Sequence, residues 1–214
     1  MAKRAEYLGP ERRRPLVLDA AEQIFAEGGF ADASMSAIAT RAGVSKAVLY
    51  DCFPGGKQEI FFSLLDRGEE TITRHVLAVL DKTNKLPLED ALRQGITAFL
   101  AYAAENRLAF QILFSEAGSS DPEIVKRSRR AKDRMVAKMG ERTRQIMEAG
   151  GVPITNLADL YNRAIVSVIE EMARWLHEDD TLRREQLVEA LVRWMMDGFS
   201  RIIPGDAWAK PADV

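Results

Sequence analysis

The sequence predicts an all-α protein with a small N-terminal helix-turn-helix domain and a larger C-terminal helical domain. Three observations lead to this fold class. Apolar residues recur at helical spacing in successive segments of the chain. The stretch from Met35 to Pro54 has the pattern of two short helices that cross at a tight turn. The chain has 214 residues, 47% of them hydrophobic, which is enough for one small and one larger core.

The turn between the two short helices is predicted at Gly43. Ala39 is small where the second helix crosses the first, and Gly43 lies where the chain needs a positive φ that glycine adopts at low cost. Val44 fills the crossing, and Ser45 is a good N-cap for a helix that begins at Lys46. A helix opened in this way can place its first residues against base edges in the major groove. Many buried helix pairs share such a turn, so the stretch alone leaves DNA binding open.

The flanking residues add several elements in a fixed order. An amphipathic first helix ends at Gly28, Gly29 and Phe30, and further matching positions are Ile38-Ala39, Ala42-Gly43-Val44-Ser45, Tyr50, Phe53 and Lys57. With these features, the segment from Pro15 to Phe62 resembles the N-terminal domain of the tetracycline-repressor-like (TetR/AcrR) transcription regulators. The rest of the chain resembles that family only in length and helical pattern. The resemblance implies a homodimeric repressor that binds a pseudo-palindromic double-stranded DNA operator and is released by a small molecule.

The first turn of the second short helix carries the residues expected to read DNA. Ser45, Lys46 and Ala47 occupy this turn, and Lys46 can donate hydrogen bonds to guanine or to phosphate. Tyr50 has an apolar ring and a polar tip that can donate to phosphate; a half-buried core tyrosine is the alternative. Cys52 stands where the family often has a phosphate-binding histidine, and the apolar pattern buries it instead.

Three further residues are candidate phosphate contacts. Ser34 and Ser36 lie where family members touch the DNA backbone, although capping of the first short helix would explain Ser34 equally well. Lys57 opens the next helix, whose N-terminal amides can also hold a phosphate.

Charge and composition narrow the possible functions. The net charge is only −2, so DNA binding requires a local concentration of basic residues. Lys3, Arg4, Arg12, Arg13 and Arg14 supply one ahead of the helix-turn-helix, although a solvated tail is an equal alternative. No apolar segment follows this arm as in a signal peptide, and no run of about 18 apolar residues suggests a membrane span. The lone Cys52 fits a reducing cytoplasm.

The residue inventory also argues against catalysis. The two histidines lie far apart, and the chain has no CxxC or HxxxH motif and no glycine-rich phosphate loop. We therefore expect no enzyme activity, no metal and no cofactor. A helical small-molecule-binding module without operator recognition is the alternative function.

The predicted organisation has four parts: a basic arm (1–14), the helix-turn-helix domain (15–56), a ligand-binding and dimerisation domain (57–205) and a tail (206–214). Helices are expected at about 15–27, 57–80, 88–104, 108–114, 122–149, 157–176 and 184–203, in addition to the two short ones. The basic run between Arg127 and Arg134 is interpreted as a solvated helix face.

Rings and methionines of the larger domain are candidates for a cavity that binds a small apolar or aromatic ligand, and His75 could hydrogen-bond a ligand there. The same residues could instead form a filled core. The candidate lining comprises Phe61, Leu65, His75, Phe99, Tyr102, Phe110, Phe114, Met135, Met139 and Trp175.

The last two helices are predicted to form a two-fold interface. Their apolar bands are wider than one packing partner requires, so a second copy of the chain is expected to cover them and complete a four-helix bundle. A monomer with an internal hairpin is the alternative. The interface residues are expected to be Leu157, Tyr161, Val168, Met172, Leu187, Leu191, Trp194, Met195 and Phe199.

Overall fold

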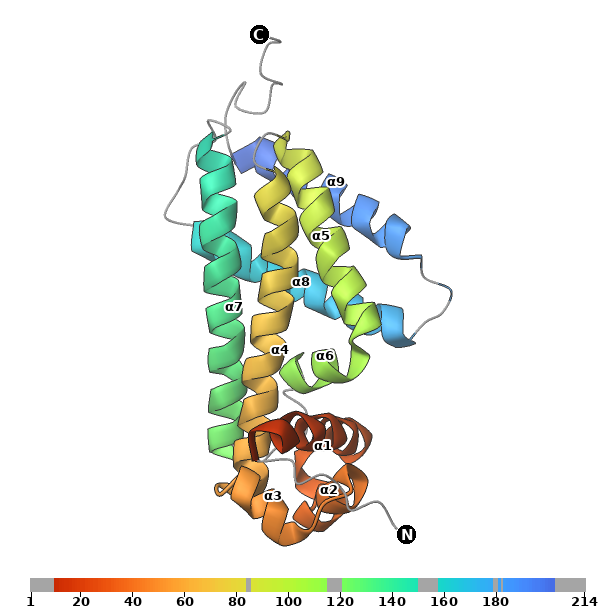
Figure 1. The fold of residues 1–214 in the computed structure, drawn as a ribbon. Coiled ribbons are helices and arrows are strands. Elements are labelled where there is room, and N and C mark those ends of the chain that lie inside the picture. Colours follow the sequence, from red (N-terminus) through yellow and green to blue (C-terminus); the bar gives the residue numbers. More distant parts are fainter. Residues whose placement is uncertain are drawn as a thin grey trace. The chain divides into compact units, whose positions relative to one another are not determined.

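The computed structural model describes residues 10–83, 86–114, 121–149, 158–178, 181 and 183–202, and within these ranges the regular structure is helical throughout (Figure 1). The helices are α1 (Pro10–Asp32), α2 (Met35–Ala42), α3 (Lys46–Cys52), α4 (Gly56–Leu80), a 3-10 turn η1 (Asp81–Thr83), α5 (Leu88–Glu105), α6 (Arg107–Phe114), α7 (Pro122–Ala149), α8 (Ala158–Glu178) and α9 (Arg184–Ile202). The predicted all-α fold is confirmed. Lys3, Arg4, Leu157 and the predicted tail lie outside the described residues.

Helix α1 differs from its predicted bounds at both ends. It starts at Pro10 instead of Pro15, and three of the basic residues expected in an arm, Arg12, Arg13 and Arg14, belong to its first turns. Pro15 is accommodated close to the N-terminus, where few backbone hydrogen bonds are lost. At the other end Gly29 has φ 72° and ψ −179°, which interrupts the helix before a last turn that reaches Asp32. The prediction that the glycine pair stops the regular helix was therefore correct, while the turn beyond it was missed.

The chain folds into two compact units, one of Met1–Glu69 and Arg107–Lys132 and the other of Glu70–Asn106 and Asp133–Val214. In the first unit α1 packs against α2, α3 and α6. Phe25, Phe30 and Phe61 form a ring cluster at its centre, with Phe61 5.2 Å from each of the other two centroids. Gly68 faces α6, and a Cβ there would lie 3.7 Å from the Cβ of Leu113, which is an ordinary van der Waals distance. This unit is thus larger than the predicted 15–56 domain.

The second unit is built on α5, which packs against both α8 and α9. Arg93 of α5 reinforces this contact: it donates to Glu189 of α9 at 2.8 Å and pairs with Glu89 and Asp90 at 2.7 Å each. The hydrogen bond from Arg93 lowers the pKa of Glu189. Across the described part of the chain, no helix is long and apolar enough to cross a membrane.

Candidate functional site

The helix pair α2–α3 has the local geometry that the sequence predicts. The hydroxyl of Ser34 accepts a hydrogen bond from the amide of Ala37 at 3.1 Å, and that of Ser45 accepts from Val48 at 3.3 Å. Gly43 adopts φ 66° and ψ 30° at the end of α2, which is the left-handed conformation expected for the turn. Each helix therefore begins with a side-chain cap.

The two faces of α3 have different environments. Leu49 is fully buried and Cys52 is 2% exposed, so this face anchors the helix in the first unit. Lys46 and Ala47 are exposed, and Tyr50 is 48% exposed. The expectation that Cys52 is buried is confirmed. The structure leaves a face of α3 open to solvent, with Lys46 and Tyr50 on it.

An ion pair joins α2 to α1. Arg41 donates to both carboxylate oxygens of Glu27, at 2.7 and 3.0 Å. Its hydrogen bonds lower the pKa of the exposed Glu27 carboxyl. Both side chains are substantially exposed to solvent, so the pair adds only modestly to the packing of α2 against α1.

Lys57 has a different environment from the one predicted. Its ammonium donates to the carbonyl oxygens of Phe30 at 2.7 Å, Ala33 at 2.9 Å and Ala31 at 3.2 Å. It also lies 4.3 Å from the centre of the Phe30 ring. These three acceptors use the donors of the ammonium group, so Lys57 stabilises the chain after the α1 kink and its Nζ is not placed as a phosphate ligand.

Arg14 is also part of the folded unit. Its guanidinium donates to the carbonyl oxygen of Cys52, lies 3.4 Å from a carboxylate oxygen of Glu59, and is 4.1 Å from the centre of the Phe53 ring. The predicted arm therefore does not extend to residue 14. Arg12, in the first turns of α1, remains exposed.

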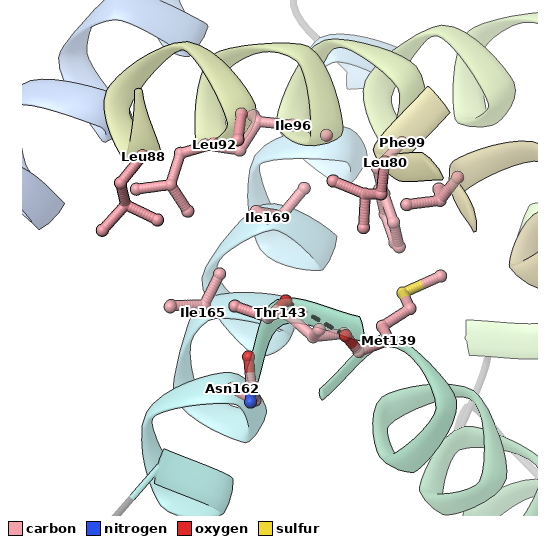
Figure 2. A pocket seen from close by; sticks show the side chains of 14 residues that line it. Leu80, Leu88, Leu92, Ile96, Phe99, Met139, Thr143, Asn162, Ile165 and Ile169 are labelled. Atoms are coloured by element: carbon pink, nitrogen blue, oxygen red, sulfur yellow. Dashed lines mark hydrogen bonds between the residues drawn. The ribbon is translucent and has the colours of Figure 1, made fainter. Parts of the chain in front are cut away.

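The second unit contains an apolar pocket with a volume of about 70 Å³ (Figure 2). Helices α4, α5, α7 and α8 all contribute to its wall. Figure 2 shows Leu88, Leu92 and Ile96 on one side of the pocket and Met139, Thr143 and Asn162 on the other. The lining residues are Val76, Leu80, Leu88, Ala91, Leu92, Gly95, Ile96, Phe99, Met139, Thr143, Asn162, Ile165, Val166 and Ile169.

Phe99 and Met139 are the predicted lining residues that this pocket contains. Phe61, Leu65, Phe110 and Phe114 are buried in the first unit instead.

Other predicted lining residues of the second unit lie outside this pocket. Tyr102 and Met135 are buried but do not line it. Trp175 is 50% exposed, and His75 is exposed with its ring 5.9 Å from that of Tyr102. Helical periodicity correctly identified most of the candidate lining residues as buried, but not Trp175 and His75, and it did not identify which residues face the cavity. Asn162 was missed, although a polar residue within the apolar band of α8 was visible in the sequence.

Comparison with known proteins decides the family. Residues 17–64 match the sequence model described as bacterial regulatory proteins, tetR family, which spans the helix pair described above. Residues 85–199, more than half of the chain, match the model of the tetracyclin repressor-like C-terminal domain. The chain belongs to the tetR family. It is a DNA-binding transcriptional regulator with a helix-turn-helix.

Several characterised tetR-family proteins are similar to it over most of their length. The HTH-type transcriptional activator FasR of Mycolicibacterium smegmatis is 25% identical over 201 residues, which cover 94% of this chain and 89% of FasR. The crystal structure of PfmR from Thermus thermophilus is 26% identical with a TM-score of 0.63, over 86% of this chain and 99% of PfmR. FadR of Bacillus subtilis, solved with stearoyl-CoA, has the same fold at 18% identity and a TM-score of 0.73, over 86% and 98% of the two chains.

The residues predicted for a tetR-type dimer interface fall into three groups. Trp194 of α9 is 60% exposed, and Val168, Met172 and Leu187 are half-buried. Leu191 and Met195 are buried within the protomer, at 1% and 3% exposure, so they pack inside the second unit rather than on its surface. The side chains of Tyr161 and Phe199 lie outside the described part, as does Leu157. Two large apolar residues of α8, Leu160 (59% exposed) and Trp175, are solvent-accessible as well.

Proposed function

We propose that this tetR-family regulator binds a pseudo-palindromic operator as a homodimer and represses transcription until a small molecule occupies the pocket of the second unit. The open face of α3 is the observation that carries the proposal. Lys46, Ala47 and Tyr50 are exposed on a helix whose other side is anchored by buried Leu49. A capped helix of this kind can enter the major groove by its N-terminal turn.

The residues of this face would have separate tasks. Lys46 can donate to guanine or to phosphate, and Ala47 can contact a thymine methyl or let the backbone approach. The Tyr50 hydroxyl can donate to a phosphate, which positions the helix without reading sequence. Ser36 is exposed and Ser34 caps α2, so both hydroxyls can still donate to the DNA backbone.

The proposed dimer uses the exposed apolar residues of α8 and α9. Leu160 and Trp175 of α8 and Trp194 of α9 are all at least half exposed in the protomer. Large exposed apolar groups of this kind are typical of an interface, and tryptophan is enriched among the residues that dominate binding energy. An isologous pairing of these two helices would form a four-helix bundle and present two copies of α3 to successive major grooves.

Small-molecule control is proposed from the pocket. It lies in the second unit and its wall includes α4, whose N-terminal half belongs to the first unit with α3. A ligand that prefers the conformation unable to bind DNA would release the operator, and nearly complete release requires a preference of about 5.5 kcal/mol. FadR of Bacillus subtilis was solved with stearoyl-CoA, which supports a role for small molecules in proteins of this fold.

Selection from genomic DNA tests this proposal. The purified protein is incubated with sheared genomic DNA at near-physiological salt, and the bound fragments are sequenced. We expect a few enriched fragments that share an inverted repeat. Uniform recovery of fragments would contradict the proposal and favour a ligand-binding module without operator recognition.

The sign of regulation needs a separate measurement, since the relative FasR is an activator. A reporter gene downstream of an enriched fragment should be less active when the protein is present. Higher reporter activity would contradict repression and leave DNA recognition in place.

A further inference from the structure

The pocket of the second unit is lined almost entirely by aliphatic side chains. Leucine, isoleucine, valine and alanine supply most of the wall, and Phe99 contributes the one ring among the described lining residues. None of these lining residues is charged. An ionic group inserted here would lose its hydration without gaining a partner, so the inserted part of a ligand must be uncharged. A wall with a single ring also offers few partners for ring stacking.

The volume of the pocket sets the size of the inserted part. An apolar cavity of roughly 150 Å³ binds one benzene ring. The pocket volume of about 70 Å³ is about half of that and therefore accommodates only a narrow part of a ligand, about three or four non-hydrogen atoms. This is the size of a short hydrocarbon segment, and it is smaller than a fused ring system.

Two polar side chains interrupt the aliphatic wall. The hydroxyl of Thr143 donates to the backbone carbonyl of Met139 at 3.0 Å, so its proton is already used (Figure 2). Asn162 has no hydrogen-bonding partner for its carboxamide within the described part of the chain. The carboxamide can both donate and accept hydrogen bonds, and it faces the pocket. It can therefore pair with an uncharged oxygen of a ligand, which would find no other partner in the aliphatic wall.

Gly140 makes room for this carboxamide. A Cβ at Gly140 would lie 3.0 Å from Nδ2 of Asn162, closer than side chains normally approach. Glycine in the interior of a helix such as α7 is unfavourable compared with alanine. Gly140 is therefore unfavourable for the stability of α7, but it leaves the space that the Asn162 carboxamide occupies.

We infer that this pocket binds an unbranched aliphatic chain carrying one uncharged oxygen, a hydroxyl or a carbonyl, which hydrogen-bonds to Asn162. The inference rests on the proposed ligand-responsive function and adds the chemical class of the ligand. The aliphatic wall selects the chain, the absence of charge from the described lining disfavours carboxylates, and Asn162 recognises the oxygen.

Three small probes test the inference on the purified full chain. Hexan-1-ol and phenol have the same number of non-hydrogen atoms, and hexanoate adds a charge. Binding is followed by NMR titration at neutral pH. We expect hexan-1-ol to bind saturably and at least tenfold more tightly than either of the other two probes.

Variants assign the binding to the pocket. Asn162→Leu should weaken hexan-1-ol binding roughly three- to tenfold, because one hydrogen bond is lost. Ala91→Phe should fill the pocket and abolish binding. Gln94→Leu is the control, because it removes an amide at an exposed position of α5 outside the pocket. It should leave hexan-1-ol binding unchanged. Far-ultraviolet circular dichroism confirms that each variant is folded. Equal binding of phenol or hexanoate, or wild-type affinity in Asn162→Leu, would overturn the inference.

The ligand class and the proposed function can fail separately. If hexan-1-ol binds as expected but chain-length homologues leave operator affinity unchanged, the class stands and the ligand-responsive function is wrong. If a charged or aromatic compound releases DNA and Ala91→Phe abolishes that release, the function stands and the ligand class is wrong.

Discussion

Basic and aromatic residues of the first unit divide into those that contact the rest of that unit and those that remain exposed to solvent. Lys57 and Arg14 are both basic and close to the helix pair, yet their charged groups are used inside the unit by carbonyl oxygens and rings. Lys46 and Tyr50 remain available on the exposed face of α3. Local positive charge in the sequence is therefore not sufficient to identify a DNA contact.

Substitutions in α3 should distinguish a residue that positions the helix on the phosphate backbone from one that contributes to base preference. Tyr50→Phe should lower affinity for all DNA sequences about equally, by roughly three- to tenfold, because it removes one phosphate hydrogen bond. Lys46→Ala should lower affinity and also reduce the preference for the operator over scrambled DNA. Fluorescence anisotropy with both duplexes measures the two effects, and Lys82→Ala in η1 is the matched control for charge. Unchanged affinity in both α3 variants would refute the assigned contacts.

Lys57 offers a test of a structural role against a DNA-binding role. Lys57→Met retains the apolar stem but leaves three carbonyl oxygens without their donor. The free energy of unfolding should fall by about 1–3 kcal/mol. Thermal denaturation should show this as a decrease in Tm of about 2–4 °C per kcal/mol. An unchanged Tm together with weaker DNA binding would instead support the phosphate contact predicted from the sequence.

At the scale of helices, most boundaries were predictable because they depend on local chemistry. Ser34 and Ser45 cap α2 and α3, Gly43 has the predicted left-handed conformation, and Pro122 opens α7. The start of α1 was not predictable in this way. Its early turns depend on the contacts of Arg14 with residues about forty positions later in the chain, and helical spacing alone does not reveal such contacts.

The lining of the pocket was harder to predict for a related reason. Periodicity shows that Phe110 and Phe114 of α6 are buried, but not that their helix belongs to the unit of α1 and not to that of the pocket. Asn162 was overlooked because its role depends on Gly140 from another helix.

The glycine pair at the end of α1 gives a prediction at this scale. Gly29 has φ 72° and ψ −179°, a conformation essentially restricted to glycine, so Gly29→Ala should cost about 1–3 kcal/mol of stability. Gly28 is helical and an added Cβ would lie 3.4 Å from that of Asp32, so Gly28→Ala should be neutral or stabilise by up to about 1 kcal/mol. Urea denaturation of the two variants compares them directly. Equal effects at both positions would contradict the account of the kink.

The whole molecule requires a second copy to present two reading helices to one operator. Trp194 is 60% exposed and lies within the apolar band proposed for the dimer. Trp194→Glu should weaken dimerisation by roughly 30-fold or more, because a central aromatic contact is replaced by a charge. Sedimentation velocity at micromolar concentration should show a dimer for the wild type and a monomer for the variant.

The control for this prediction is Gln94→Glu, which adds the same charge at an exposed position of α5. It should remain dimeric. A monomeric wild type, or a dimer that tolerates Trp194→Glu, would exclude the proposed arrangement of α8 and α9.

In the proposed dimer, two copies of α3 read one operator. Hydroxyl-radical footprinting of the wild-type protein on an enriched genomic fragment tests this arrangement most directly. We expect two protected regions related by the two-fold symmetry of the inverted repeat, with centres one or two helical turns apart, or about 10–21 base pairs. A single protected region, or protection without sequence preference, would contradict a dimer that reads DNA through α3.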